Sequence, residues 1–543
     1  MISNKCIFYV FLVLTLCCIL ADAITTDNSL PLYGVKRHGF VNRRRDGVGA
    51  ITSNHGGLEK RKKENDKDKD DKGEYAGRGP INKAAAEDSF EDNDPTGSSE
   101  CQSPSDGQPL VQYAVVMDAG SQGTRIHIYK FNYCSDYPQI ESDIYTKDKT
   151  GLSTLANDPQ KAAEVIEPLL KQAMEKVPQE LHKSTPITLR GTAGLRLIEE
   201  NKRNELLQQV RDKIQESTDF LLDTNNNDGG VIVMSGEDEG LYEWWALNYV
   251  LENLKTPTDS ETVGIISMGG ASTQFVFQPP QDASIPQEYK KTYRGPSGSH
   301  DVYAQSYLGF GKTEARSKVF EEILSSSSQQ NDGSGKDIVY STCFDSSFSS
   351  NKPPTTGTDE DEESIQDNED GGGPMTVAGT KDPGDDGFQK CYDTIKSIFR
   401  VSDINDIDSN SGPDSVDSNI QFEQAPSELL PDNQTLFATS KIYDMVKAFK
   451  IGPDFTPNDM KVLASKTCQH DKSAFNDIKK SKDLKEMLDD PYLCVDTTFI
   501  YALLIDGLKL SPDRTLHASD DLNGFKMGWA MGAAIDMLLN KNN

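Results

Sequence analysis

The sequence predicts an α/β fold in which two related lobes face one cleft. Segments with the two-residue apolar period of strands alternate along the chain with segments that have the 3.6-residue period of helices. In addition, an apolar strand, a glycine-rich loop and a second strand occur twice, so that Asp118 aligns with Ser267, 149 residues later. Two similar loops on two similar strand pairs indicate an internal repeat and therefore two lobes.

The strand and helix patterns follow one another in a regular order. An apolar strand over 111–120 ends at a glycine turn, and the period-two segment 125–131 completes a hairpin with it. Two acidic low-complexity tracts, 344–388 and 403–418, are expected to be disordered surface insertions, because regular patterns resume after each. The other predicted elements are a helix over 159–176, strands within 187–194 and 231–236, a helix over 237–254, and a second strand pair over 264–270 and 272–277.

Composition argues against one class of partner. The chain has 543 residues, with 56 lysines and arginines against 86 aspartates and glutamates, and 35% apolar residues. Because nucleic acid backbones are bound by positive surfaces, a formal net charge of −30 argues against a nucleic acid partner. A small nucleotide remains possible, since backbone N–H groups or a divalent cation can hold its phosphates.

The N-terminal segment has the features of a secretory signal. Lys5 precedes 16 residues, 6–21, of which one is polar, and a small-x-small site ends at Ala23. Residues 1–23 are therefore expected to be a signal peptide or a retained signal anchor, because 16 residues fall just short of the roughly 17 to 25 that span a bilayer. Residues 24–107 lack apolar periodicity and are expected to be a disordered lumenal stem.

Six cysteines follow this segment, and an even number in an oxidising compartment favours three disulfides. Their wide, irregular spacing, without a Cys-x-x-Cys pair, argues against a zinc site. Asn433, in the sequence Asn-Gln-Thr, is a candidate glycosylation site. Other cysteine pairings remain open, but pairing sequence neighbours gives Cys101–Cys134, Cys343–Cys391 and Cys468–Cys494.

The two glycine-rich loops suit a phosphate group. Glycine allows close backbone approach, so successive N–H groups can form an anion-binding nest, with serine and threonine hydroxyls as further donors. A plain hairpin turn is the alternative for either loop alone, whereas the pair is more specific. The candidate phosphate-binding residues are Asp118, Gly120, Ser121, Gln122, Gly123, Thr124 and Arg125 in the first loop, and Gly269, Gly270, Ala271, Ser272, Thr273 and Gln274 in the second.

A hydrolase that attacks with water also needs a base near its cleft. Residues 235–240 place Glu237, Asp238 and Glu239 at a junction between a strand and a helix. Acidic residues in a first helical turn usually complement the helix dipole, which accounts for Glu237 and Asp238. Glu239, which is followed by Gly240 and by a helix with two tryptophans, is the candidate catalytic base.

Five segments in order carry a resemblance to a known family: VVMDAGSQGTR, RGTAGLRLI, SGEDEGLYEWWALNYVL, GIISMGGASTQF and GFKMGWAMGAA. Over 110–536 the chain resembles the apyrase-type nucleoside phosphohydrolases, or ectonucleotidases. QYAVVMDAGSQGTRIHIYKF and QSYLGFGKTEARSKVF are most similar to the fungal Golgi guanosine diphosphatases.

This resemblance implies an actin/Hsp70/sugar-kinase-like (ribonuclease H-like) fold, with the nucleotide cleft between lobe I (108–235 and 522–543) and lobe II (236–521). It supports the two later disulfides, and it implies that Thr192 lines the cleft and that Glu239 is the general base. It also implies a divalent cation, Mn²⁺, Mg²⁺ or Ca²⁺, to neutralise phosphate charge. The residues that would hold this cation through water are Asp118, Glu239, Ser267 and Trp529.

Four positions depart from the family pattern. Ser267 stands where an aspartate is usual, so cation binding is expected to be weaker, and Ser267→Asp is expected to strengthen it. Family members carry aromatic residues in place of Leu508 and near Lys441, where they would sandwich a base, so the base preference stays open. Gln122 replaces a small hydroxyl residue. Separately, the segment 309–313, GFGKT, mimics a P-loop without its strand-to-helix context, and we reject that interpretation.

The sequence therefore predicts a divalent-metal-dependent nucleoside diphosphatase that acts on GDP, and also UDP, in the Golgi lumen, where it would support protein glycosylation. Two alternatives remain open: a broad-specificity secreted or vacuolar apyrase that cleaves tri- and diphosphates, and a catalytically weakened nucleotide-binding relative. A sugar kinase is disfavoured, because nothing marks a base for an alcohol substrate. Membrane contact is expected only through the possible N-terminal anchor, and the sequence gives no oligomeric state.

Overall fold

The computed structural model describes residues 94–121, 123–223, 229–255, 262–295, 298–326, 338–354, 375–399, 429–478 and 481–539. All of them belong to one compact unit of the chain, Gly73–Asn543, and the other unit, Met1–Lys72, lies outside them. The predicted signal segment 1–23, Gln122 and the acidic tract 403–418 also lie outside the described residues. Within the described ranges, no helix is long and apolar enough to cross a membrane.

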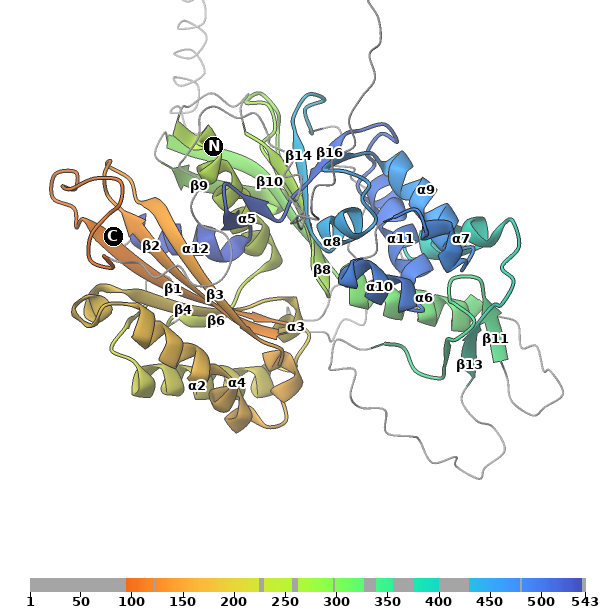
Figure 1. Cartoon of the computed structure of the whole chain (residues 1–543), viewed down its shortest axis with the longest axis horizontal. Helices are drawn as coiled ribbons and strands as arrows, with labels where there is room; N and C mark the ends of the chain where they lie inside the picture. Colours follow the sequence, from red (N-terminus) through yellow and green to blue (C-terminus); the bar gives the residue numbers. More distant parts are fainter. Residues whose placement is uncertain are drawn as a thin grey trace, which may run out of the picture. The chain divides into compact units, whose positions relative to one another are not determined.

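The first sheet has the strand order β3-β2-β1-β4-β5, with β6 also paired to β4 (Figure 1). β1, β2 and β3 are antiparallel neighbours, whereas β4 is parallel to β1, β5 and β6. Gly120 pairs with Gly123 at the tip of the β1–β2 hairpin, which confirms the first predicted hairpin. The strands are β1 (Val111–Gly120), β2 (Gly123–Asn132), β3 (Gln139–Asp148), β4 (Pro186–Gly191), β5 (Leu221–Leu222) and β6 (Val231–Val233).

The second sheet has the order β15-β16-β14-β7-β8-β10-β9. β10, β8 and β7 are antiparallel neighbours, and β14 is parallel to both β7 and β16. The order β10-β8-β7-β14-β16 therefore repeats β3-β2-β1-β4-β6 of the first sheet, direction for direction, as the internal repeat predicted. The strands are β7 (Gly264–Met268), β8 (Ser272–Phe277), β9 (Lys290–Gly295), β10 (Gly298–Leu308), β14 (Leu436–Ser440), β15 (Asp454–Phe455) and β16 (Leu516–Ala518).

Helices cover both faces of each sheet. α2 (Pro159–Lys176) and α4 (Glu200–Ser217) pack on one face of the first sheet, where their apolar sides meet strand residues such as Val115. α5 (Gly236–Val250) and α12 (Trp529–Leu539) lie between the two sheets (Figure 1). One apolar cluster there joins Val116 of β1, Trp244 of α5 and Val276 of β8 to α12.

The central position of α5 and α12 explains their sequences. A helix that is covered on all sides must be apolar all round, and α12 reads WAMGAAIDMLL. The two helices also pack closely, since a Cβ on Gly532 would collide with the carbonyl oxygen of Tyr242. α5 begins at its N-cap Ser235, whose side chain accepts a hydrogen bond from the amide of Asp238 at 3.0 Å.

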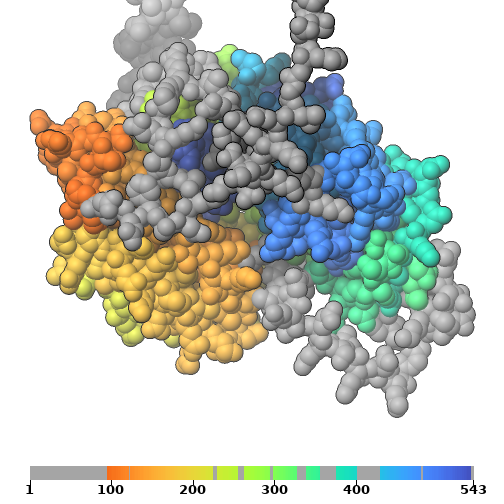
Figure 2. Space-filling view, in the orientation of Figure 1, coloured from red at the N-terminus to blue at the C-terminus, as the bar shows by residue number. Residues whose placement is uncertain are grey.

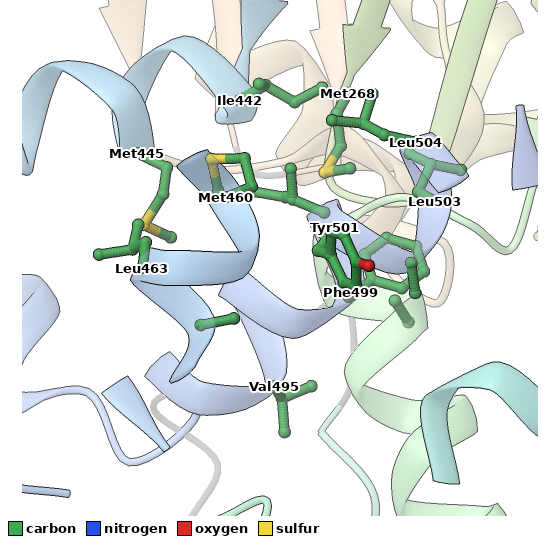
Figure 3. Close-up of a cluster of buried hydrophobic side chains, with 14 of the residues drawn as sticks. Met268, Ile442, Met445, Met460, Leu463, Val495, Phe499, Tyr501, Leu503 and Leu504 are labelled. Carbon is green, nitrogen blue, oxygen red and sulfur yellow. The ribbon is translucent and has the colours of Figure 1, made fainter. Parts of the chain in front are cut away.

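The other face of the second sheet carries the largest apolar core. Met268 at the end of β7, Met460 and Phe499 lie in this core (Figure 3). In the space-filling view the helices α8 to α11 are blue, and the first sheet with its helices is orange to yellow (Figure 2). The helices are α6 (Lys312–Ser326), α7 (Gly387–Ser397), α8 (Lys441–Ala448), α9 (Pro457–Thr467), α10 (Lys482–Asp489) and α11 (Leu493–Ala502).

Two predictions of disorder are wrong at their edges. Of the tract 344–388, the described residues include β12 (Ser349–Ser350) and β13 (Thr376–Gly379), which form a small sheet with β11 (Ile338–Ser341). Phe348 is buried there, so composition misled because polar residues surround a few buried apolar ones. Of the stem 24–107, residues 94–107 are folded onto the first sheet: the Tyr113 hydroxyl donates to the Pro95 carbonyl at 2.9 Å, and Cys101 is bonded to Cys134.

All three disulfides expected from sequence neighbours are present: Cys101–Cys134, Cys343–Cys391 and Cys468–Cys494. The first joins the segment before β1 to the end of β2, whereas the other two lie buried in the helical part beside the second sheet. Asn433 is exposed in a turn before β14, so it is accessible to a glycosyltransferase.

Candidate active site

The first glycine-rich loop is a tight turn that is packed on both sides. Gly123 has a φ of +145°, which favours glycine, and a Cβ there would lie 2.6 Å from the carbonyl oxygen of Asp148. Gly194, in the short helix α3 (Ala193–Arg196), packs against Ser121 so closely that a Cβ would lie 3.0 Å from its Cα. The hydroxyl of Thr124 donates to the carbonyl of Thr150 at 2.8 Å, so this side chain is directed toward the end of β3.

Asp118 lies near the tip of the same hairpin, and only one of its two carboxylate oxygens accepts a hydrogen bond in the described part of the chain. Arg125, its register partner on β2, donates from Nη1 to Oδ2 at 2.7 Å. Oδ1 is buried, and no group in the described part of the chain hydrogen-bonds to it. A buried carboxylate oxygen without a partner is costly, so this atom suits a cation or its bound water.

The second loop is held by the segment that follows β10. Lys312 and Thr313 donate their backbone N–H groups to the carbonyls of Gly269 and Gly270, at 2.9 and 2.8 Å. Because a trans peptide points its C=O and N–H in opposite directions, the N–H groups of Gly270 and Ala271 face away from α6. They are therefore directed as an anion-binding nest requires.

The side chains of the second loop are buried and engaged with one another. Thr273 donates its hydroxyl to the carbonyl of Phe310 at 2.7 Å. Gln274 donates from Nε2 to the hydroxyls of Ser272, at 2.7 Å, and Ser306, at 3.2 Å. The side chains of Thr273 and Gln274 are thus already engaged in hydrogen bonds. The backbone N–H groups of this loop are the part suited to phosphate.

Glu239 occupies the first turn of α5, and its side chain is 15% exposed, against 42% for its neighbour Asp238, which forms an ion pair with Lys291 at 2.8 Å. Burial raises the pKa of Glu239, and an ion pair with Arg196 opposes this shift. The charge of Asp118 raises the pKa further, so the two carboxylates lie within electrostatic reach of each other. The fold thus brings the candidate base of α5 near the candidate cation residue of β1.

Ser267 lies on β7 and is buried, and its neighbour is a carboxylate. Its hydroxyl lies near enough to Glu243, one helical turn after Glu239 on α5, to lower the pKa of that carboxyl. Thr439, the register partner of Ser267 on β14, donates its hydroxyl to Glu243 Oε1 at 2.6 Å. Burial raises the pKa of Glu243 to about 7, although both hydroxyls oppose the shift.

Two other predicted residues lie at the ends of helices. Thr192 is buried where β4 meets α3, and its amide donates to the carbonyl of Ala119 at 3.3 Å, beside the first loop. Trp529 is the first residue of α12 and is 6% exposed in the apolar cluster between the sheets. Its contacts are thus those of a packing residue, and its role near a cation stays a prediction.

Positive side chains gather near Asp118. Burial and the nearby charges of Arg125 and Lys441 lower the pKa of Lys147. A cavity of about 80 Å³ lies beside Lys441 and is lined also by Met268, Asp444 and Phe499. Leu508, by contrast, is fully buried in the helical core.

Sequence reasoning did not assign roles to three groups of this site. Arg196 lies within the quoted motif RGTAGLRLI, so the motif offered a signal. Glu243 and Thr439 carry no such signal in the sequence, because they are 196 residues apart and contact each other only in the fold. The segment 309–313 was rejected as a P-loop, and its actual contact is with the second glycine-rich loop.

The chain is similar to known proteins over most of its length. It is 28% identical over 445 residues to a guanosine-diphosphatase of Schizosaccharomyces pombe, covering 80% of this chain and 75% of the relative. It is 27% identical over 440 residues to the nucleoside diphosphate phosphatase ENTPD5 of Homo sapiens, covering 78% and 87%. A solved nucleoside triphosphate hydrolase from Neospora caninum has a similar fold, with a TM-score of 0.54 and 16% identity over 80% of this chain and 93% of that chain.

The solved neighbour confirms the predicted two-lobed α/β fold. The family model of the GDA1/CD39 (nucleoside phosphatase) family matches residues 108–543, a range that contains both glycine-rich loops and Glu239. The chain therefore belongs to the GDA1/CD39 (nucleoside phosphatase) family.

Proposed function

We propose that the protein hydrolyses nucleoside diphosphates, GDP and also UDP, to the monophosphate and phosphate with the help of a divalent cation. The observation that carries this proposal is the largely buried carboxylate of Glu239, paired with Arg196 and within electrostatic reach of Asp118. Family membership and the names of the relatives, guanosine-diphosphatase and nucleoside diphosphate phosphatase, support the substrate class.

The residues present fit a divalent cation. The buried Oδ1 of Asp118 has no hydrogen-bond partner in the described part of the chain, and oxygen atoms are the ligands that hard cations such as Mg²⁺ prefer. Asp118, with Ser267 across the internal repeat and with Glu239, would hold the cation through its water shell. When bound, the cation neutralises phosphate charge and helps the leaving group depart.

The other steps belong to the protein's own groups. Glu239 would accept a proton from the water that attacks the terminal phosphorus, and Arg196 would hold its carboxylate ionised and in place. The N–H groups of Gly270 and Ala271, with those of the first loop, would donate to the phosphate oxygens as their charge grows. The bond from the terminal phosphorus to the bridging oxygen breaks, and no covalent enzyme intermediate is required.

We place this reaction in the Golgi lumen. Three disulfides suit the oxidising secretory pathway, and a lumenal domain follows from a signal peptide or anchor in 1–23. Transfer of sugars from GDP-sugars releases GDP, so its hydrolysis would remove a product inhibitor of glycosylation. Loss of electrophoretic mass on Asn433→Gln would test whether the chain enters the secretory pathway and receives a glycan there.

Phosphate release by the purified full chain tests the proposal. GDP, UDP, ADP and their triphosphates are compared with Mg²⁺, Mn²⁺ or Ca²⁺, and with EDTA. We expect release from GDP and UDP, slower release from GTP, and none with EDTA. Equal rates on GTP and GDP would instead identify a broad apyrase, and nucleotide binding without release would identify a catalytically weakened relative.

A further inference from the structure

Glu243 is a buried acidic residue whose surroundings do not match an ordinary core position. It is 5% exposed, and no lysine, arginine or histidine in the described ranges forms an ion pair with it. Its neighbours are two hydroxyls, those of Thr439, at 2.6 Å, and Ser267. Buried carboxylates are rarely retained without a cation partner, so this one calls for a role.

The position of these hydroxyls points to the cleft. Ser267 and Thr439 are register partners on the parallel strands β7 and β14, and each lies one residue before the carboxyl end of its strand. Ligands of open α/β sheets bind outside these ends. Ser267 also lies two residues before Gly269, the first residue of the second glycine-rich loop, so it lies where phosphate and cation would meet.

Helix geometry places Glu243 in line with the candidate base. Glu239 and Glu243 are four residues apart on α5 and therefore share one face of that helix. The charge of Glu239 also acts on Glu243. α5 thus presents one carboxylate toward Asp118 and the next toward Ser267.

The internal repeat relates Ser267 and Glu243 to Asp118 of the first lobe. In the first lobe, β1 supplies the carboxylate Asp118 at the position that β7 fills with Ser267 in the second lobe. We propose that Glu243 supplies the carboxylate that β7 lacks, acting through Ser267 and Thr439 as a positioning residue for the divalent cation. The inference rests on the proposed function.

The mechanism concerns the orientation of two hydroxyl groups. Thr439 donates its hydroxyl proton to Glu243, and the nearby Ser267 hydroxyl, which also lowers the pKa of this carboxyl, would direct its proton there as well. The lone pairs of both oxygens are then turned away from Glu243, where they can accept hydrogen bonds from the water shell of a cation. Ser267 oriented in this way can accept hydrogen bonds from cation-bound water, as an aspartate does at the equivalent place. The negative charge of Glu243 remains close to the cation.

This arrangement changes the expected effect of Ser267→Asp. An aspartate placed on β7 would direct its carboxylate at that of Glu243, and like charges at such close range repel. The single substitution is therefore expected to give no gain in cation affinity, contrary to the expectation from the sequence alone. The aspartate should raise cation affinity only in a chain whose Glu243 is already neutral, where it restores the lost charge.

A double-mutant cycle tests the proposal. The full chain and the variants Glu243→Gln, Ser267→Asp and Ser267→Asp/Glu243→Gln are titrated with Mn²⁺ alone, and free Mn²⁺ is followed by electron paramagnetic resonance. We expect Glu243→Gln to weaken Mn²⁺ binding at least tenfold, because its amide can donate to Ser267 and turn that hydroxyl proton outward. The double variant should recover to within about threefold of the parent, a non-additive result.

Two matched variants separate this role from a structural one. Asp238→Asn removes the same charge from the same helix at an exposed position and should leave Mn²⁺ affinity within twofold. Ser267→Ala keeps Glu243 but removes the oxygen through which it acts, and should weaken Mn²⁺ binding as Glu243→Gln does. Thermal unfolding of each variant is measured in parallel.

The proposal is overturned if Glu243→Gln lowers only the unfolding temperature and leaves Mn²⁺ affinity unchanged, or if Ser267→Asp alone binds Mn²⁺ more tightly than the parent. If Glu243→Gln does not fold, the comparison of Ser267→Ala with Ser267→Asp decides the matter. Because no nucleotide is present in these titrations, absence of GDP hydrolysis would refute the proposed function without affecting this result.

Discussion

Arg196 governs the state in which Glu239 can serve as a base. Burial raises the pKa of Glu239, and a protonated carboxyl cannot accept a proton from water. The guanidinium of Arg196 opposes this shift by pairing with the carboxylate, and its Nε is itself fixed by donating to the Met234 carbonyl at 2.8 Å. The candidate base is therefore a pair of two side chains, Glu239 from α5 and Arg196 from α3.

Removal of the base itself gives the first prediction. Glu239→Gln keeps the shape of the side chain and the helix start, but an amide cannot accept the proton of the attacking water. We expect kcat for GDP to fall by at least about 10²-fold, the usual scale for a general base. Phosphate release measures kcat, and near-normal turnover would transfer the role to Glu237 or Asp238.

The second prediction concerns removal of the positive charge of Arg196. In Arg196→Gln the carboxylate of Glu239 loses its positive partner, so its pKa should rise further and less of it should be ionised at neutral pH. We expect kcat to fall by about tenfold or more, since one unit of pKa corresponds to tenfold in the ionised fraction. Arg196→Lys, which keeps the charge, is the control. Equal activity of Arg196→Gln and the parent would contradict a pair that acts as one unit.

At the scale of single elements, the second glycine-rich loop depends on the start of α6. Gly311 lies so close to this loop that a Cβ would be 2.5 Å from the amide nitrogen of Ser272 and 2.6 Å from that of Ala271. Both neighbours are backbone atoms, which cannot rotate away as a side chain can. Packing against this loop therefore requires a glycine at position 311, the second glycine of GFGKT.

Gly311→Ala is therefore expected to displace the loop. Overpacking against backbone costs about 1–3 kcal/mol, which corresponds to roughly five- to 150-fold in kcat/KM for GDP if it falls entirely on phosphate binding. Glu321→Ala, at an exposed position of the same helix, should leave kcat/KM unchanged. Kinetics of both variants provide the test, and unaltered kcat/KM in Gly311→Ala would mean that the loop tolerates displacement.

An ion-pair network joins α6 to α11 behind this loop. Asp496 is buried and accepts from Arg316 at 2.7 and 2.6 Å, and Lys312 lies 3.1 Å away. Burial alone would raise the pKa of Asp496, but the two cations outweigh it and lower the pKa below its usual value. A lowered folded-state pKa means that this carboxylate stabilises the protein above its unfolded pKa, and that the contribution is lost as pH falls through the folded pKa.

Asp496→Asn should destabilise the protein by about 3–5 kcal/mol at neutral pH, because a buried arginine is left without its main partner. The variant should also lose less stability than the parent on acidification below about pH 4, the unfolded value for aspartate. Urea unfolding at several pH values measures both effects. Asp490→Asn, which removes the more exposed partner of Arg316, is the control and should cost less.

At the scale of the whole molecule, the sequence was most informative where signals are local. The two hairpins with their glycine loops were predicted because a period of two and a glycine turn lie within about twenty residues. The placement of α5 and α12 between the sheets was not predicted. It depends on the close approach of Gly532 to Tyr242, two residues that are far apart in the sequence. The contact of Glu243 with Thr439 is of the same kind. Local patterns thus sufficed to propose Asp118 and Glu239 as candidates, whereas the contacts that each of them makes required the fold.

The three disulfides differ in burial and in their distance from the site. Cys343, Cys391, Cys468 and Cys494 are at most 1% exposed, whereas Cys101 and Cys134 are partly exposed. The Cys101–Cys134 bond lies at the open end of the β1–β2 hairpin, and the first glycine-rich loop lies at its tip. Ten strand residues at about 3.3 Å each separate the two ends by roughly 30 Å.

Graded reduction should therefore act in two stages. Mild reductant should first open Cys101–Cys134, which alkylation and peptide mapping would detect, with little change in GDP hydrolysis. The two buried bonds should open only together with unfolding, and Cys343→Ser/Cys391→Ser should lower the free energy of unfolding by about 2–5 kcal/mol. If activity instead falls in step with alkylation of Cys101 and Cys134, the bond that anchors residues 94–107 must control the first glycine-rich loop through the full length of β1 and β2.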